Sequence, residues 1–514
     1  MPLFDRQFVI VACLLLAVLS SEAAAPAPDF LFPSGGKVGT TVDVTVGGKL
    51  DGWPVGVWTD HAGLVFKAAK TSGAFTVTIG ADVPPGPHLV RFFNPDGAAE
   101  PRTFVVGTRN ELLESEPNDD YRKAQQLGEA PVVVNGRLDK AGDADSFSIR
   151  AEQGKWIVAA VDAYALGSSV DPVVQILDEQ GVRMALNHDT HNLDPLVAWQ
   201  APRTGTYIVQ VFGFAHPPAA DVSARGSAAS VYRLTITTGP FVRFAFPAGV
   251  KRGTRSSVSL LGWNLDNVRA MQTVDASRVQ TADQMIHLPA VPTGDTLWLD
   301  VGDAVELSEM EPNDAPANAQ RIALPATLNG RIGQPGDVDR FAFTAKRGER
   351  FNFRVLAAVL HSPLAARLRV EDTNGVQLAQ QEGGDGTDPQ LGWGAPADGT
   401  FVVAVSDMFG NGGWDHFYRI EHVAPPPHFT ATIPTNTFYL ENGRTNEIKV
   451  TVTRAGGFKD KLVINVKGLP NGVTARADAV PDKSGEVKLE LVAGADAEPA
   501  GVPVEILLSA PEVR

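Results

Sequence analysis

Two acidic clusters, each rich in side-chain oxygens, recur in the same order along this chain. Each begins with Glu-x-Glu-Pro-Asn-Asp and continues, after a short interval, with Gly-Asp-x-Asp. The candidate ligands are Glu114, Glu116, Asn118, Asp119, Asp143 and Asp145 in the first cluster, and Glu309, Glu311, Asn313, Asp314, Asp337 and Asp339 in the second. An all-oxygen set of about six ligands suits Ca²⁺, which tolerates varied geometry, better than Mg²⁺, which demands a strict octahedron. The sequence therefore predicts Ca²⁺ as a cofactor at two sites.

The spacing within each hexamer explains how its side chains can meet. In an extended segment alternate side chains share one face, so Glu114, Glu116 and Asn118 can converge. Pro117 favours extension because it fixes its own φ and restricts the residue before it. The Asp-x-Asp pair can approach from a neighbouring loop. Carboxylates packed this closely would repel one another without a cation.

A purely structural alternative assigns the hexamer to helix capping. Asn118 and Asp119 would cap a short helix around 121–127, while the glutamates are solvated. Capping explains neither the Glu-x-Glu pair nor its recurrence with an Asp-x-Asp partner. The two interpretations can also coexist.

Catalytic motifs are missing from the sequence. There is no Gly-x-Ser-x-Gly elbow and no His-Glu-x-x-His pair, and the single cysteine, Cys13, lies in the apolar N-terminal stretch. His188 and His191 flank Asp189 and could bind zinc or act as a base. The aligned second copy has Glu382 at the place of His188, which is typical of a variable, solvated loop tip. We therefore predict no catalytic residue and no enzyme activity for this chain.

Aromatic residues give a weaker signal for ligand binding. Trp199 and Trp393 occupy equivalent positions before Ala-Pro and are predicted to lie in the cores. The glycine-rich loops at 212–214 and 409–414 are better candidates for a binding surface, although hairpin packing is their more usual use.

Composition predicts an all-β protein built of tandem β-sandwich modules. At 514 residues the chain is too long for one core, and its 50 Gly and 37 Pro indicate many turns between short strands. The net charge is −15 and no basic cluster stands out, which excludes a nucleic-acid partner.

The first residues predict export, either secreted to the extracellular space or to the periplasm. An apolar stretch at 8–19 is followed by small residues at 20–25, as in a signal peptide, with cleavage after Ala23, Ala24 or Ala25 left open. A lipoprotein reading of Ile10 to Cys13 is disfavoured because the apolar run continues past the cysteine. No second apolar run is long enough for a membrane span after signal cleavage, so we expect a protein that is soluble or held by a partner.

Self-comparison reveals a repeat of a small β domain followed by a larger one. Landmarks of the larger domains keep a constant offset, for example Gly136 with Gly330 and Asp194 with Asp388. The predicted divisions are 1–25 (signal peptide), 26–107 (Ig-like), 108–239 (first large sandwich), 240–303 (short Ig-like), 304–424 (second large sandwich) and 428–514 (C-terminal Ig-like module).

The acidic motifs, the Gly-Asp-x-Asp-x-Phe strand and the Gly-Thr-Tyr or Gly-Thr-Phe strand resemble the bacterial pre-peptidase C-terminal (PPC) domain, in two copies over about half of the chain. The resemblance implies a jelly-roll-like sandwich with calcium held where the acidic segment packs on it. It implicates the twelve residues named above, with Tyr232 and Tyr418 as further ligands. The small domains resemble IPT/TIG-type modules, the last a bacterial Ig-like domain, and the whole resembles large secreted proteins of bacteria such as planctomycetes.

These observations predict a secreted, calcium-binding accessory module that binds, targets or supports an extracellular assembly or hydrolase. One alternative is a secreted peptidase whose catalytic domain lies beyond Arg514. Another is a binder of collagen-like or polysaccharide matrix. An extracellular protein or polysaccharide is the expected kind of partner, and the sequence leaves the ligand and the oligomeric state open.

Overall fold

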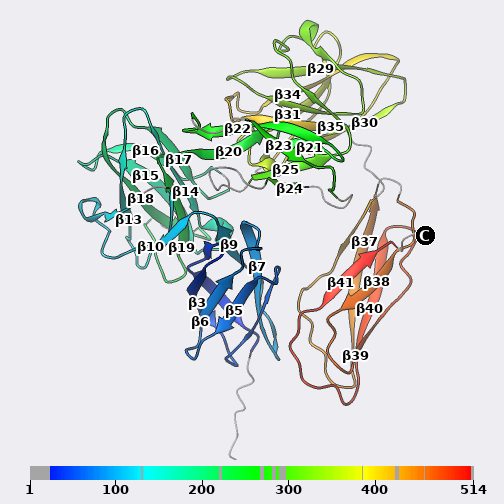
Figure 1. Ribbon diagram of the computed structural model, residues 1–514. Coiled ribbons are helices and arrows are strands. Elements are labelled where there is room, and N and C mark those ends of the chain that lie inside the picture. Colours follow the sequence, from blue (N-terminus) through cyan, green and yellow to red (C-terminus); the bar gives the residue numbers. More distant parts are fainter. Residues whose placement is uncertain are drawn as a thin grey trace, which may run out of the picture.

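The computed structural model describes residues 24–128, 131–190, 192–218, 223–266, 271–279, 285–288, 297–384, 386–422, 428–455 and 458–510. Within these residues ten sheets form five pairs, each pair enclosing one hydrophobic core (Figure 1). The regular helical structure among them consists of four 3₁₀ turns of three residues. The predicted all-β class is therefore confirmed. The predicted signal peptide lies almost wholly outside the described residues.

The first pair, here called the first small sandwich, packs sheet β1-β3-β6-β5 against sheet β2-β9-β7-β4. Its strands are Ala27–Phe32 (β1), Gly35–Lys37 (β2), Thr41–Lys49 (β3), Gly56–Thr59 (β4), Leu64–Ala68 (β5), Ala74–Ile79 (β6), Gly86–Asn94 (β7), Gly97–Ala98 (β8) and Arg102–Gly107 (β9). The period-two valines of β3 bury Val44 and Val46, as the alternation predicts.

The first large sandwich follows directly. Its elements are Asn110–Leu113 (β10), Tyr121–Lys123 (η1), Gln125–Gln126 (β11), Val132–Arg137 (β12), Asp145–Ala151 (β13), Trp156–Asp162 (β14), Tyr164–Leu166 (η2), Val170–Leu177 (β15), Arg183–Asn187 (β16), Leu196–Gln200 (β17), Gly205–Ala215 (β18) and Val231–Thr237 (β19). The two sheets run β10-β12-β19-β14-β17 and β11-β13-β18-β15-β16. Strands β10 and β19 therefore flank β12 on opposite sides.

The second small sandwich has two three-stranded sheets, β20-β22-β23 and β21-β25-β24. Its described strands are Phe241–Phe246 (β20), Gly249–Lys251 (β21), Arg255–Trp263 (β22), Met271–Asp275 (β23), Met285–Leu288 (β24) and Leu297–Gly302 (β25). Strand β21 pairs in parallel with β25, as β2 pairs with β9 in the first small sandwich.

The second large sandwich repeats the strand order of the first, as β26-β28-β35-β30-β33 and β27-β29-β34-β31-β32. Its elements are Val305–Ser308 (β26), Pro316–Asn318 (η3), Gln320–Arg321 (β27), Ala326–Arg331 (β28), Val338–Ala345 (β29), Arg350–Leu356 (β30), Ala358–Leu360 (η4), Ala366–Glu371 (β31), Gln377–Glu382 (β32), Gln390–Gly394 (β33), Gly399–Asp407 (β34) and Phe417–His422 (β35). The constant sequence offset between the copies thus reflects a repeat of the structure.

The C-terminal sandwich pairs sheet β36-β37-β40-β39 with the two-stranded sheet β38-β41. Its strands are His428–Thr432 (β36), Thr445–Ala455 (β37), Val463–Lys467 (β38), Val473–Ala477 (β39), Gly485–Ala493 (β40) and Glu505–Ser509 (β41).

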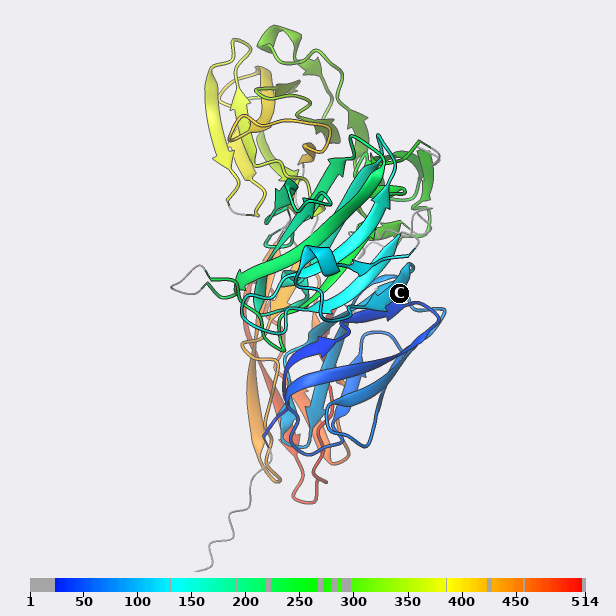
Figure 2. The same cartoon turned by 90° about the vertical axis from the view of Figure 1, so that its left-hand side faces the viewer.

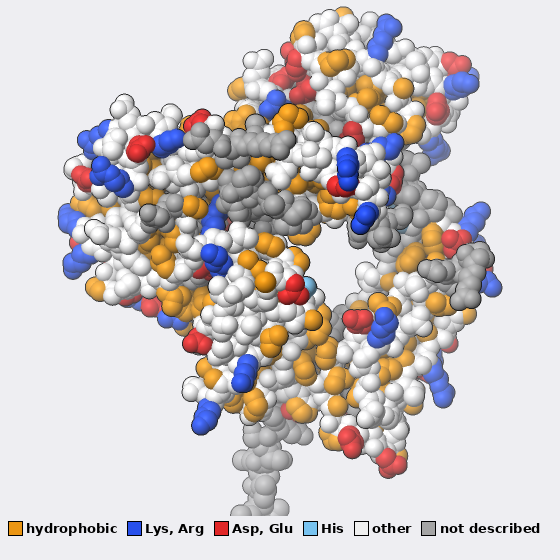
Figure 3. Space-filling model, in the orientation of Figure 1, with side chains coloured by type: hydrophobic (Ala, Val, Ile, Leu, Met, Phe, Trp, Pro, Cys, Tyr) orange, Lys and Arg blue, Asp and Glu red, His pale blue; other side chains and the backbone are white. Residues whose placement is uncertain are grey.

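The C-terminal sandwich folds back beside the first small sandwich, at the other end of the chain (Figures 1 and 2). Arg91 donates to the Asn436 carbonyl oxygen at 3.0 Å, and Asn436 Nδ2 donates to Glu100 Oε2 at 2.8 Å. Figure 3 shows that this contact leaves an opening through the middle of the molecule. The five sheet pairs therefore follow a ring-like path.

Candidate metal centres

The first acidic hexamer lies between β10 and η1, against the start of β13. The Asn118 carbonyl oxygen accepts a hydrogen bond from Ser146 N at 3.2 Å, which ties the hexamer to the strand that carries the Asp-x-Asp pair. As a result, carboxylate oxygens of Glu116, Asp119 and Asp143 all lie within 4.8 Å of one another. Residues that are distant in sequence are thereby brought to one point.

Asn118 is the most informative member of this cluster. Its side chain is fully buried, yet neither its Oδ1 nor its Nδ2 atom has a hydrogen-bond partner. Oδ1 of the buried Asp145 carboxylate also lacks a hydrogen bond, and Oδ1 of Asp143 has no hydrogen bond but lies 3.4 Å from Lys140 Nζ. Since buried polar atoms are nearly always paired, and an unpaired one costs about 1–3 kcal/mol, such a group of unpaired oxygens fits a bound cation. Hard oxygens of this kind are the donors that Ca²⁺ takes.

A buried tyrosine supports the inner side of the first centre. Tyr232 donates its hydroxyl hydrogen bond to Asp145 Oδ2 at 2.6 Å and lies 3.2 Å from Glu114 Oε2. Burial, and then the charge of Glu114, raises the pKa of Asp145 to about 10. Burial also raises the pKa of Glu114 to about 7. Without a cation this pair retains protons at neutral pH, because its charges have no counter-ion.

The second centre repeats these features. Asn313 is fully buried and both of its amide atoms lack partners, and oxygens of Glu309, Glu311 and Asp339 lie within 4.8 Å of one another. Tyr418 donates to Asp339 Oδ2 at 2.6 Å and lies 3.3 Å from Glu309 Oε2. Burial, and then Glu309, raises the pKa of Asp339 to about 10.

The remaining predicted ligands of the second centre, Asp314 and Asp337, lie beside each other. Burial, and then a hydrogen bond with Asp314, raises the pKa of Asp337 to about 6. The same hydrogen bond lowers the pKa of Asp314. The structure therefore brings carboxylate oxygens of Glu116, Asp119 and Asp143 together in the first large sandwich, and those of Glu309, Glu311 and Asp339 in the second.

The helix-capping interpretation of Asn118 and Asp119 is wrong. The turn η1 is capped by Asp120, whose Oδ1 accepts from Arg122 N at 3.0 Å. In the second copy no side chain caps η3. The asparagine is buried in both copies because its backbone is tied to β13 or packed beside β29, so its side chain points inward and cannot reach a turn N-H group.

The hexamer is not extended along its whole length, although the sequence led us to expect extension for Glu114, Glu116 and Asn118. The chain bends at Glu116 and at Glu311. Glu116 Oε2 accepts from Asn118 N at 2.9 Å, and Glu311 Oε2 accepts from Asn313 N at 2.8 Å. A side-chain acceptor bonded two residues onward closes a local turn instead of an extended segment.

The two tyrosines predicted as further ligands have a different contact pattern from the acids. Tyr232 and Tyr418 are fully buried and donate their hydroxyl hydrogens to carboxylates. Burial raises the pKa of each phenol well above its ordinary value, so both remain protonated donors. The two hydroxyl groups therefore orient Asp145 and Asp339 by hydrogen bonding.

Sequence reasoning missed the buried arginine that follows each tyrosine. Arg233 donates to Glu111 Oε2 at 2.8 Å and to Asn135 Oδ1 at 3.0 Å. A Cβ atom at Gly35 would lie 2.2 Å from Arg233 Nη1, so the first small sandwich closes directly over this guanidinium. The recurrence of Tyr-Arg in both copies was the available signal.

Arg419 occupies the same place in the second repeat. It donates to Glu306 Oε2 at 3.0 Å and to Asn329 Oδ1 at 2.7 Å, and Gly249 covers it as Gly35 covers Arg233. It also pairs with Asp300 of the second small sandwich at 2.9 Å. Each metal centre and each junction between sandwiches is therefore built on the same pair of strands.

The other chemical candidates from the sequence are placed differently. His188 Nδ1 lies 2.8 Å from Asp189 Oδ2 with its side chain 65% exposed, while His191 lies outside the described residues. Trp199 and Trp393 pack against the two large cores, as predicted. Phe409 is 77% exposed at the tip of its loop.

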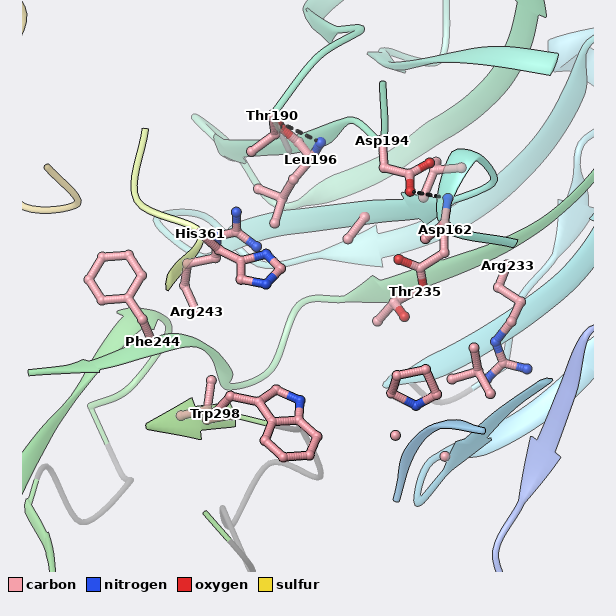
Figure 4. A pocket seen from close by; sticks show the side chains of 18 of the residues that line it. Asp162, Thr190, Asp194, Leu196, Arg233, Thr235, Arg243, Phe244, Trp298 and His361 are labelled. Carbon is pink, nitrogen blue, oxygen red and sulfur yellow. Dashed lines mark hydrogen bonds between the residues drawn. The ribbon is translucent and has the colours of Figure 1, made fainter. Parts of the chain in front are cut away.

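A cavity of about 530 Å³ lies where the first four sandwiches meet. Figure 4 shows Asp162 and Asp194 on one side of it, with Arg243, His361 and Trp298 on the others. Trp298 is 46% exposed although the rest of β25 is buried. Asp194 is held by three backbone N-H groups, whereas the exposed side chain of Asp162 faces the cavity.

Comparison with known proteins gives partial similarities. No family model matches the chain. A stretch of 112 residues, 21% of this chain, is 35% identical to a probable subtilase-type serine protease of Deinococcus radiodurans, of which it covers 15%. The chain thus spans a small part of that relative.

Solved structures resemble the chain weakly. The pre-peptidase C-terminal domain of a Bacillus anthracis collagenase aligns with 22% of this chain and 98% of that domain, at 16% identity and a TM-score of 0.18. The Bacteroides ovatus protein SGBP-B of a mixed-linkage glucan utilization locus, in complex with a heptasaccharide, aligns over 76% of this chain and 73% of its own, at 10% identity and a TM-score of 0.14. Escherichia coli alpha-2-macroglobulin aligns over 95% of this chain and 46% of its own, at 9% identity and a TM-score of 0.15.

Within the described residues, no helix has both the length and the apolar character needed to cross a membrane.

Proposed function

We propose that this chain is a secreted, calcium-binding protein of five β-sandwich domains that acts as an accessory binding, targeting or structural module of an extracellular assembly or hydrolase. The observation that carries the proposal is the pair of fully buried asparagines, Asn118 and Asn313, each without partners for its amide atoms inside a cluster of carboxylates. The neutral amide oxygen and the charged oxygens together form the donor set of a calcium site.

Calcium in these centres would stiffen the junctions between sandwiches. In the first repeat, Glu111 lies on β10 and Glu114 directly follows that strand, while Tyr232 and Arg233 are adjacent on β19. The inner pair, Glu114 and Tyr232, faces the metal centre, and Glu111 and Arg233 face the small sandwich. Fixing the first pair therefore restrains the second, so chelation should loosen the small sandwich from the large one. Small-angle scattering that is identical in calcium and in chelator would count against this role.

The similarity to a stretch of a probable serine protease supports association with a secreted peptidase. The PPC-like motifs point the same way. In this proposal the chain assists a peptidase and does not itself carry out the catalysis, because no catalytic motif is found among its residues. A search of the flanking reading frame for a Ser/His/Asp or zinc-protease motif tests whether a peptidase domain lies beyond Arg514.

Thermal melts in EGTA, in millimolar calcium and in millimolar magnesium test the calcium sites. A site at a hundred times its Kd adds about 2.7 kcal/mol to the stability of its domain. We expect a rise specific to calcium that is lost in the double variant Asp143→Ala/Asp337→Ala. Identical melts in all three buffers would overturn the proposal.

The interdomain cavity supports a second candidate function, the binding of a polysaccharide. An exposed indole and polar side chains from several domains suit a sugar ring, and interdomain cavities of about 300–1,000 Å³ are common ligand sites. The test is a pull-down on insoluble polysaccharides with Trp298→Ala as the variant. Trp199→Phe, which changes a core-packed indole instead, is the control. Equal retention of the wild type and Trp298→Ala would exclude the cavity as the binding site.

A further inference from the structure

The first metal centre contains a cation of its own, the ammonium group of Lys140. Lys140 Nζ lies 3.0 Å from Asp119 Oδ2 and 3.4 Å from Asp143 Oδ1. Both carboxylates belong to the group whose oxygens converge within 4.8 Å. The lysine thus neutralises two of the oxygens that a calcium ion would need.

The second centre has no ammonium group at this place, and its neighbouring arginine, Arg340, donates to the main-chain carbonyl oxygen of Asp314 and pairs with Glu371. The residue at the corresponding position is Gln334, between the same landmarks Gly330 and Asp337. Among the described residues, no Lys, Arg or His nitrogen lies within 4.0 Å of the five carboxylates of this centre, whereas the first has Lys140. The fully buried Asn313 is as unpartnered as Asn118, while the oxygens that converge within 4.8 Å belong to Glu309, Glu311 and Asp339 here and to Glu116, Asp119 and Asp143 in the first centre.

The neighbouring difference between the copies does not cancel this charge. Asp139 of the first copy corresponds to Gly333 of the second. Its carboxylate pairs with Arg137, outside the converging oxygens. Lys140 is therefore the cation that contacts the carboxylates of the first centre, whereas the charge that the second copy gains, Arg340 in place of Ser146, contacts a main-chain oxygen.

An ammonium group at this place competes with an incoming dication. Calcium must break two ion pairs and then tolerate a positive charge nearby, because like charges a few ångströms apart repel even near a protein surface. The side chain of Lys140 is 59% exposed and its four-carbon stem is flexible, so it can swing away into water. The lysine therefore weakens calcium binding without blocking it.

We propose that the two centres differ in calcium affinity, with the Gln334 centre binding more tightly, and that Lys140 serves as an internal counter-ion that keeps the first centre assembled without metal. This inference rests on the proposed calcium function. It makes the first junction less dependent on calcium than the second. At low calcium the second large sandwich would be the one that responds.

Calorimetric titration of the whole secreted chain with calcium tests the affinity order. Asp337→Ala leaves the first centre and Asp143→Ala leaves the second, so each can be titrated alone. We expect the second centre to bind about tenfold more tightly, since a single nearby charge is worth on the order of one decade in a binding constant. Lys140→Gln in the Asp337→Ala background should tighten the first centre to match, and Gln334→Lys in the Asp143→Ala background should weaken the second.

Lys155→Gln is the matched control, because it removes the same charge from an exposed lysine paired with Asp266 away from the centre. It should leave both affinities unchanged. Near-UV circular dichroism of each variant checks that it remains folded, and the two-step titration of the wild type gives the affinity order without any ligand substitution. Equal affinities that Lys140→Gln does not alter would overturn this inference while leaving the calcium function intact. The absence of calcium binding at both centres would instead remove the proposed function itself.

Discussion

The second repeat joins its small sandwich to its large one through an ion pair that the first repeat lacks. In the second, Asp300 on β25 pairs with Arg419 at 2.9 Å. The strand register places Val105 on β9 at the same position in the first, opposite Gly35 as Asp300 is opposite Gly249. Two junctions with the same strand order and the same buried arginine therefore differ in the ion pair at this position. This shows how a duplicated architecture can acquire two interfaces of unequal strength.

The electrostatics of the second junction follow from this extra carboxylate. Burial opposes the Arg419 cation, but Glu306 and Asp300 outweigh it and raise its pKa. Burial also raises the pKa of Asp300 to about 6, because the guanidinium that favours its charge is shared with Glu306 and the charge of Glu421 lies nearby. The positive charge of Arg419 is thus balanced by nearby acids, whereas the ionised form of Asp300 is disfavoured by the low dielectric of the interface.

Removal of the buried arginines should produce the largest contrast between the repeats. Arg419→Ala leaves Asp300 and Glu306 without their counter-ion and should cost about 3–5 kcal/mol. Arg233→Ala leaves Glu111 alone and should cost about 2 kcal/mol. Urea unfolding measures both, with the exposed Arg255→Ala as a control expected to change stability by less than about 0.5 kcal/mol. Equal losses for the two buried arginines would show that Asp300 contributes nothing to the junction.

The stability of the second junction should depend on pH through Asp300. Its folded-state pKa, about 6, lies above the ordinary value of 3.8, so its contribution is full below pH 3.8 and is lost as pH rises through about 6. The loss is at most about 3 kcal/mol, from a shift of roughly two units. Melts from pH 4 to pH 7 should show the wild type losing stability relative to Asp300→Asn. A constant difference between the two over this range would refute the shift.

Substitution of the unpartnered asparagines should change sign with calcium. Asn313→Leu removes a buried amide that has no partner, which is neutral or stabilising by about 1 kcal/mol in EGTA. In saturating calcium the same change removes a ligand and should lower the melting temperature relative to the wild type. If Lys140 takes the place of the ion in the first centre, the calcium-dependent loss of melting temperature will be smaller for Asn118→Leu than for Asn313→Leu. Variants that are destabilised equally with and without calcium would mean that the amides have an ordinary packing role.

The smallest effect is expected at the histidine loop, whose counterpart in the second repeat has no histidine. His188 is exposed and pairs only with its neighbour Asp189. His188→Ala should therefore change stability by less than about 0.5 kcal/mol. Casein hydrolysis by the purified chain that disappears in this variant would instead reveal a catalytic function for the loop.

Much of the fold was predictable because it depends on local patterns. Period-two valines gave the buried face of β3, and the glycine and proline clusters gave the turns between short strands. The constant offset between Gly136 and Gly330 gave the repeat. The acidic clusters were also predictable, because the same residue types recur in the same order in both copies.

The roles within the site were less predictable because they depend on long-range packing. The cap of η1 is Asp120, one residue beyond the predicted pair. The sequence contains Lys140 and Arg233 but gives no sign that one lies among the acids and the other under a neighbouring domain. Both facts need the three-dimensional arrangement of strands that are distant along the chain.

The sequence by itself determined which atoms are available: two sets of acidic and amide oxygens, in equal order, on an all-β chain. The tertiary structure decided which of those atoms are left unpaired. Asn118 and Asn313 are buried without partners, Lys140 pairs with two carboxylates of one centre, and Asp300 adds an ion pair to one junction. The physical reason is that composition and spacing fix local geometry, whereas desolvation and pairing depend on which distant groups fold against each other.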